Sequence, residues 1–176
     1  EHSWWWLDVS TAALGFAAGA LRAEAAEVAP AGAASGKAAE QAAEALLEPC
    51  VDLIDLFEFL PPAEASPVAV ALQESLDRAL VAVAGAADSA RVKQLLSAVL
   101  TKTKSDDVEV RLSAVRRCQR LWAELGVQVV GGLSEVVMYA SELLEDEDAR
   151  VEEAVRLLVK TMEECTGESL QDALKR

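Results

Sequence analysis

Hydrophobic residues recur three or four positions apart over long stretches of the chain, and polar residues fill the positions between them. This spacing places the apolar side chains on one face of an α-helix, whereas the strict alternation typical of a strand is absent. The pattern predicts helices over 89–103, 107–125 and 149–166. Their expected buried faces are Val92, Leu95, Leu96, Val99 and Leu100; Val108, Leu112, Val115, Cys118, Trp122 and Leu125; and Val151, Val155, Leu158, Met162 and Cys165.

Further helices are expected over 3–29, 37–59, 67–85 and 133–144, with a short amphipathic stub over 169–174. Pro49 removes a backbone donor and should kink or split its helix near Leu47. The stretches 29–36 and 60–67 are rich in small residues and proline, so they are expected to be linkers. Asp88 is a plausible N-cap, whereas Gly85, Gly126 and Gly167 are the expected helix ends.

Four consecutive acidic residues, Glu145 to Asp148, allow three interpretations: a metal loop, a disordered acidic tract or a turn between helices. A calcium loop starting at Asp146 would place Arg150 at its fifth position and Val151 at its sixth, where an oxygen ligand and a glycine are needed. A tract of four acids between two periodic segments is too short to stay disordered by self-repulsion. The favoured interpretation is a turn whose aspartate caps the next helix.

The same signal occurs at Asp107, which aligns with Asp148 at a period of 41 residues. This period lies within the range of about 40–47 residues that is typical of HEAT-type helix pairs. It favours a solenoid over a bundle. The expected fold is therefore all-α, a HEAT-type α-solenoid of about four antiparallel helix pairs over residues 1–176, capped by the segment 149–174.

The chain has 176 residues, of which 52% are hydrophobic, and a net charge of −14. This hydrophobic content is too high for a disordered acidic protein, and the net charge argues against a surface that wraps nucleic acid. The window 91–120 nevertheless holds eight basic and three acidic residues, a net charge of +5, so the rest of the chain carries −19.

Six cations of this window form a candidate basic ridge that could bind RNA phosphates or an acidic protein segment. The alternative is that they pair with acids of neighbouring repeats or are simply solvated. No aromatic residues are interleaved with them, so sequence-specific reading of RNA is not expected. The six residues are Lys102, Lys104, Arg111, Arg116, Arg117 and Arg120.

Residues 4–21 are apolar enough to imitate a minimal transmembrane helix, but they contain Asp8 and lack a basic flank. A buried helix of a soluble protein is favoured, with Trp4, Trp5 and Trp6 covering the interface with an upstream repeat. Three widely spaced cysteines, expected to be small buried hydrophobes, and a single histidine, His2, give no zinc or catalytic pattern. No enzyme activity, metal, cofactor or small-molecule substrate is expected.

The C-terminal half resembles one family of large HEAT-repeat proteins. The resemblance rests on the turn and helix from Lys102 to Arg111, on "SELLEDEDARVEE" and on the terminal "GESLQDAL", and it covers about 88–174. "AEALLEPCVDLID" (43–55) is similar to the family's preceding helix. The family is the U3 small nucleolar RNA-associated protein ten of the small-subunit processome, a subunit of its UtpA (t-UTP) subcomplex.

This resemblance implies the C-terminal end of a nucleolar scaffold, without enzyme activity, that supports pre-18S processing and ribosomal DNA transcription. Its implied partners are other UtpA and processome proteins and, through backbone contacts, pre-ribosomal RNA or U3 small nucleolar RNA. Two other functions stay open from the residues alone. One is a HEAT- or armadillo-type adaptor in transport or signalling. The other is a membrane-associated helical protein, which rests only on residues 4–21.

Overall fold

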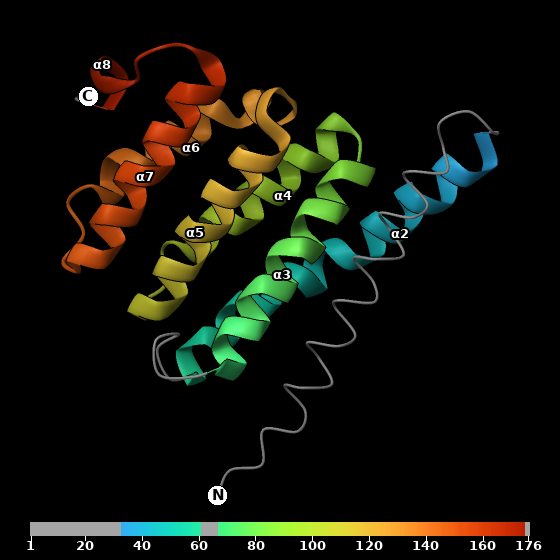
Figure 1. Ribbon diagram of the computed structural model, residues 1–176, viewed down its shortest axis with the longest axis horizontal. Coiled ribbons are helices and arrows are strands. Elements are labelled where there is room, and N and C mark those ends of the chain that lie inside the picture. The colour runs from blue at the N-terminus through green and yellow to red at the C-terminus, as the bar shows by residue number, and fades with distance from the viewer. Residues whose placement is uncertain (1–32, 61–66, 175–176) are drawn as a thin grey trace, which may run out of the picture. The chain divides into compact units, whose positions relative to one another are not determined.

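The computed structural model describes residues 33–60 and 67–174, and the predictions for residues 1–32, 61–66 and 175–176 lie outside this range (Figure 1). The described residues form helices and turns and contain no strand, which confirms the all-α class. The chain divides into two compact units, Glu1–Asp88 and Ser89–Arg176. Each unit is described by itself.

The first unit contains α2 (Ala33–Asp52), the 3₁₀-helix η1 (Leu53–Phe59) and α3 (Pro67–Ala86). α2 and α3 pack against each other and run in opposite directions (Figure 1). Buried apolar side chains from all three elements fill the space between them, because burial of such side chains is the main favourable contribution to folding. They include Ala43, Leu47, Cys50, Ile54, Phe57, Leu72, Leu76 and Leu80.

Two boundary predictions for this unit are wrong. The α-helix is not split near Leu47 but continues through Pro49 to Asp52 and then tightens into η1. A proline removes only its own donor, and the buried neighbours Leu47 and Cys50 hold the helix against the core on both sides of it. The predicted linker 29–36 is also too long, because α2 begins at Ala33. α3 ends at Ala86, near Gly85 as predicted.

The second unit contains α4 (Ser89–Lys102), α5 (Val108–Leu125), the 3₁₀-helix η3 (Gly126–Gly132), α6 (Leu133–Leu143), α7 (Ala149–Thr166) and the short α8 (Gln171–Leu174). The apolar stripe predicted for α4 is buried throughout, and those of α5 and α7 are buried except at Val108, Leu125 and Cys165, which are half-buried. Gly126, with φ of 50°, and Gly167, with φ of 71°, end α5 and α7 as predicted.

α5 and α7 lie side by side and run in the same direction (Figure 1). Glu109 pairs with Arg150 near the start of the two helices, 41 residues apart, and Gln119 donates to Thr161 in the middle, 42 residues apart. Near the end, Cys165 donates to the backbone oxygen of Trp122, 43 residues away. Three contacts at a nearly constant separation show that α5 and α7 lie in parallel register, at a spacing close to the predicted period of 41 residues.

The repeating unit of this stack is a helix followed by its acidic turn and a second helix. α4 is followed by the turn at 103–107 and then α5, and α6 is followed by the turn at 144–148 and then α7. α4 packs against α5, α6 packs against α7, and η3 contacts all four helices. Buried Val129 anchors η3. The segment from Gly126 to Gly132, which the sequence predicts to contain no helix, is therefore a packed 3₁₀ connection between the two pairs.

One helical run among the described residues, Val108–Leu143, is long and apolar enough to cross a membrane by length and composition alone. It is composed of α5, η3 and α6, and the positive φ of Gly126 interrupts it. The run is therefore not one continuous α-helix. The membrane-like segment 4–21 lies outside the described residues.

Candidate functional site

The two acidic turns at 103–107 and 144–148 are built alike. The Asp107 carboxylate accepts from the backbone N–H of Val110 at 3.1 Å, and that of Asp148 accepts from the N–H of Arg150 at 2.8 Å. Each carboxylate satisfies a donor that the first helical turn leaves unpaired. The prediction that the acidic run is a capped turn is confirmed, because its last aspartate caps α7.

A second polar side chain supports each cap from two residues upstream. Ser105 Oγ accepts from the N–H of Asp107 at 3.2 Å, and Asp146 Oδ1 accepts from the N–H of Asp148 at 2.9 Å. Serine and aspartate both favour this local turn, because their short side chains reach the backbone two residues on. The two turns differ in that Asp146 brings a negative charge to a position where Ser105 is neutral.

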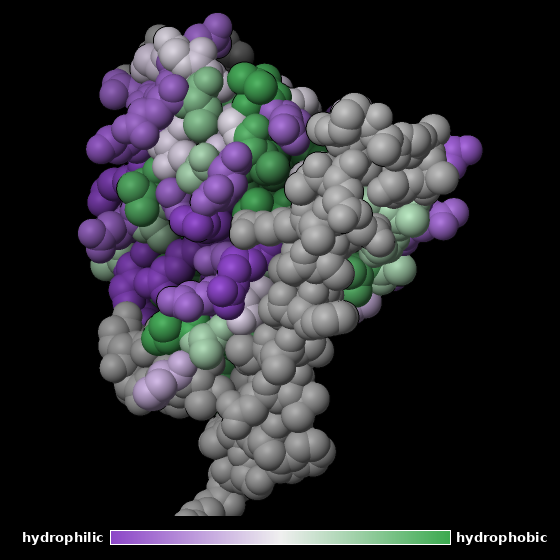
Figure 2. All heavy atoms as spheres, turned by 45° about the vertical axis from the view of Figure 1, so that its right-hand side comes forward, coloured by the Kyte–Doolittle hydropathy of each residue, from purple (hydrophilic) through white to green (hydrophobic). Residues whose placement is uncertain are grey.

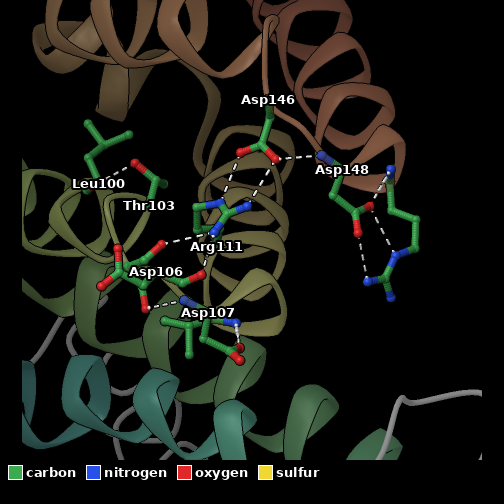
Figure 3. Close-up of polar contacts among 10 residues, drawn as sticks. Leu100, Thr103, Asp106, Asp107, Arg111, Asp146 and Asp148 are labelled. Carbon is green, nitrogen blue, oxygen red and sulfur yellow. Dashed lines mark hydrogen bonds and ion pairs between the residues drawn. The ribbon is translucent and has the colours of Figure 1, made fainter.

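Arg111 on α5 forms an ion pair with Asp146 and so links the two turns (Figure 3). Its Nε and Nη2 donate to the two carboxylate oxygens of Asp146 at 2.9 and 3.0 Å, a bidentate ion pair. Its Nη1 donates to the backbone oxygens of Ser105 and Asp106 at 3.0 and 2.9 Å. The guanidinium therefore fixes the first turn to the second, and only 14% of the Arg111 side chain and 7% of the Asp146 side chain are exposed.

The ion pair shifts the pKa of both partners. The Arg111 guanidinium holds the pKa of Asp146 below its usual value, chiefly through the hydrogen bonds it donates. The same bonds raise the pKa of Arg111, so both groups stay charged at neutral pH. A second pair, Arg150 to Glu109 at 2.7 Å, lies nearby but is more exposed, and Arg150 also holds Asp148 at 3.0 Å.

The structure separates the six predicted ridge residues into buried, paired and surface cations. Arg117 is only 2% exposed and donates to the backbone oxygen and the hydroxyl of Ser113 at 3.1 and 3.4 Å. The prediction that it binds a partner or RNA is wrong, because its guanidinium lies in the core. Arg111 follows the alternative that the sequence left open, since it pairs with an acid of the neighbouring repeat.

Four of the ridge residues keep surface exposure. Arg120 is exposed and pairs with Glu124 at 2.8 Å, while Arg116 and Lys102 are half-buried. Lys104 is exposed and lies over the ring of Tyr139, 4.8 Å from its centroid. On the face that Figure 2 presents, hydrophobic and hydrophilic side chains are interspersed. The ridge is thus narrower than the sequence predicts, and its binding role stays a prediction.

The described residues offer little chemistry beyond packing and ion pairs. Burial raises the pKa of the Cys50 thiol to about 11 and that of Cys118 to about 12, so both are protonated at neutral pH. Cys165 is half-buried, against the expectation that it is buried. No group of three or more histidine, cysteine or acidic side chains suited to a metal ion occurs in the ranges 33–60 and 67–174. Trp4, Trp5 and Trp6 lie outside these ranges.

Two features of this region were not predicted from the sequence. The first is the Arg111–Asp146 pair. The sequence feature that could have indicated it is that the second turn has Asp146 where the first turn has Ser105. The second is a groove between the start of α4 and η3, whose walls come from segments far apart in the sequence. Sequence periodicity cannot reveal the groove, because it depends on where η3 packs.

The proteins that this chain is similar to are named as HEAT-repeat and U3 small nucleolar RNA-associated proteins. The chain is 39% identical over 103 residues, 58% of its length, to HEAT repeat-containing protein 1 homolog of Drosophila melanogaster. It is 38% identical over 98 residues, 55% of its length, to U3 small nucleolar RNA-associated protein 10 of Neurospora crassa. It is 36% identical over 108 residues, 54% of its length, to the protein of that name in Aspergillus niger.

These matches confirm the resemblance inferred from the sequence. The chain spans only 5% of the Drosophila relative and 6% of each fungal one. No protein-family model matches the chain, and no solved structure matches it.

Proposed function

We propose that this chain is part of a HEAT-type α-solenoid that acts as a non-enzymatic scaffold subunit of the small-subunit processome, the 90S pre-ribosome, in the nucleolus. In this role it supports pre-18S RNA processing and, through the UtpA subcomplex, ribosomal DNA transcription. Its partners are other UtpA and processome proteins. The names of the relatives, which refer to HEAT repeats and to U3 small nucleolar RNA, support this function.

The parallel register of α5 and α7 is the observation that carries the proposal. A solenoid repeats one helix pair so that each pair contacts only its neighbours, and equivalent helices then lie parallel at one repeat length. The contacts Glu109–Arg150, Gln119–Thr161 and Trp122–Cys165, at separations of 41, 42 and 43 residues, have this property. A helical bundle of unrelated helices has no reason to keep such a register.

A scaffold of this kind works by holding surfaces in a fixed arrangement rather than by chemistry. The Arg111–Asp146 pair fixes one turn of the stack to the next, so that the outer faces of α5 and α7 keep a defined spacing. Arg116 and Arg120, one helical turn apart on α5, then present cations to pre-ribosomal RNA phosphates or to an acidic partner segment, with Lys102 and Lys104 beyond them.

Affinity purification of the tagged chain from nuclear extract tests this function. We expect co-purification of UtpA proteins together with pre-18S RNA and U3 small nucleolar RNA, and accumulation of the tagged chain in nucleoli. A diffuse cytosolic distribution without associated pre-ribosomal RNA would overturn the proposal. It would favour instead an adaptor in transport or signalling.

Charge reversal on α5 tests the surface cations of the ridge. The double variant R116E/R120E should lower the recovery of RNA or protein partners at least about fivefold, because it removes two cations from the contact and adds two anions. Its melting temperature should stay unchanged, because both side chains reach solvent. The matched control is R156E/K160E on α7, which changes the net charge by the same amount and should not affect recovery.

A further inference from the structure

A groove with a volume of about 440 Å³ opens between the first turns of α4 and the connection η3. Its size is within the range of about 300–1,000 Å³ that is typical of ligand pockets. The walls carry Val92 and Leu96 from α4 and Val127 and Val129 from η3. The groove lies wholly within the second unit and is separate from the Arg111–Asp146 network.

Two adjacent glycines shape the groove in different ways. A Cβ atom built on Gly132 would lie 2.8 Å from Leu96 Cδ1, so glycine at this position lets η3 pack closely on α4. A Cβ atom built on Gly131 would meet nothing within 4 Å. The missing side chain at Gly131 therefore leaves the groove open, although the fold itself would accept a larger residue there.

The rim of the groove exposes apolar surface that the fold does not cover. Val127 is 77% exposed and Val130 is 37% exposed, and both are on η3. Exposed apolar side chains next to a groove are typical of surfaces that bind another molecule. Single exposed apolar residues are common, but Val127 lines the groove itself, whereas Val130 belongs to the same element without lining it.

The charged side chain that lines the groove is positive, whereas the chain as a whole is acidic; the nearby Asp88 precedes α4 and does not line the groove. Among the described residues that line it, Lys93 is the only charged one, and its side chain is exposed. The first turn of α4 contains no acidic residue, so nothing in that turn offsets the Lys93 charge. The chain as a whole carries −14. An apolar groove with a cationic rim is complementary to an apolar side chain flanked by carboxylates.

We propose that this groove binds a short acidic segment of a partner protein, with one apolar side chain between the walls and a carboxylate at Lys93. RNA does not fit the groove, because its lining offers one cation and no aromatic side chain for base stacking. The proposal does not rest on the scaffold function, because the groove is argued from its own walls and charge.

Peptide binding to the full 176-residue chain tests the groove. The probe is a fluorescein-labelled pool of octapeptides with Leu, Ile, Phe or Trp at the two central positions and Asp or Glu elsewhere. One control pool has Lys or Arg in place of the acids, and a second has Ala at the two centres. By fluorescence anisotropy we expect the probe pool to bind at least about tenfold more tightly than either control pool. Backbone amide NMR shifts should change in the first turn of α4 and in η3.

Two matched variants connect binding to the groove. G131L should fill the groove and lower the affinity at least about tenfold with an unchanged melting temperature, because its Cβ meets no atom. Its control is G85L on α3, where a Cβ also meets nothing within 4 Å, and which should bind as the unchanged chain does. K93E should lower the affinity at least about fivefold, whereas K37E, at an exposed lysine of the first unit, should not.

Three results would overturn the proposal. The first is equal binding of the acidic and basic pools, or no saturable binding of any pool. The second is peptide binding that G131L leaves unchanged. The third is self-association of the chain in sedimentation that G131L abolishes, since the groove would then hold a second copy. Binding of the probe pool in a chain that fails to purify processome proteins would keep this inference and reject the scaffold function.

Discussion

α5 and α7 occupy equivalent places in successive helix pairs, and each has 18 residues and begins at a capping aspartate. They differ at the positions that face the next helix. On α5 these positions hold Arg111, Val115 and Gln119, which contact Asp146, the core and Thr161 respectively.

One repeat later, 41 residues on, the same positions of α7 hold Glu152, Arg156 and Lys160. There Glu152 pairs with Arg156 within the helix, and Lys160 pairs with Glu164 at 3.9 Å, as the sequence predicts. The residues on α5 thus pack against a neighbouring helix, whereas those on α7 form ion pairs within their own helix. The two helices have similar backbones, and three side chains decide whether this face packs against a neighbour or remains at the surface. A polar outer face is typical of a capping helix, and the cap over 149–174 stays a prediction.

Exchange of one residue between the two helices is expected to have the largest effect. V115R places on α5 the residue that α7 has at this position, and it should lower the free energy of unfolding by about 4 kcal/mol or more, because it buries an unpaired charge. The reverse exchange, R156V, should change it by less than about 0.5 kcal/mol. Urea denaturation of both variants measures the difference. Similar effects in the two would mean that the helices are not packed differently.

Loss of the ion pair between the turns comes next. D146N should lower the free energy of unfolding by about 2 kcal/mol, and the double-mutant cycle with R111M should give a coupling of about 1–3 kcal/mol. The matched control is S105N in the first turn, which keeps a side-chain acceptor for the cap and breaks no ion pair, and it should have little effect. A coupling near zero would show that Arg111 and Asp146 act independently.

The pH dependence of this pair has a defined direction. The pKa of Asp146 is lowered in the folded chain, so the pair contributes fully above the unfolded-state pKa of about 3.9 and is lost as the pH falls through the folded pKa. The difference in unfolding free energy between the unchanged chain and D146N should therefore stay constant from about pH 7 to pH 5. It should shrink only in more acidic solution. A difference that vanishes near neutral pH would contradict the assignment.

Removal of the helix caps should have the smallest effect on stability, and the effect should be similar for α5 and α7. D107A removes one side-chain acceptor from a first helical turn and should cost about 1 kcal/mol. D148A removes the equivalent acceptor together with an exposed pair to Arg150 that adds little, so its effect should be similar. Thermal or urea unfolding of the two single variants and their combination checks this. Costs that differ strongly between the two would mean that the turns are alike in sequence only.

Much of the second unit could be predicted from the residues. The stripe of α4 from Val92 to Leu100, the end of α5 at Gly126 and the capping roles of Asp107 and Asp148 follow from local rules of periodicity and capping. The continuity of α2 through Pro49 and the burial of Arg117 could not be predicted. At Pro49, the packing of its buried neighbours overrides the local propensity to break the helix. Arg117, which the sequence predicts to be a surface cation, is stabilised in the core because Ser113 supplies hydrogen-bond acceptors.

The α-helices of the second unit, their caps and the spacing of 41 residues could be predicted from local patterns, because hydrophobic periodicity and capping act between residues a few positions apart. The tertiary structure decided which cations remain on the surface, which turns are joined by Arg111 and where η3 leaves a groove open on α4. These outcomes depend on how segments far apart in the sequence pack, as with Arg111 and Asp146, which are 35 positions apart. A local pattern carries no information on such pairs until the helices have packed.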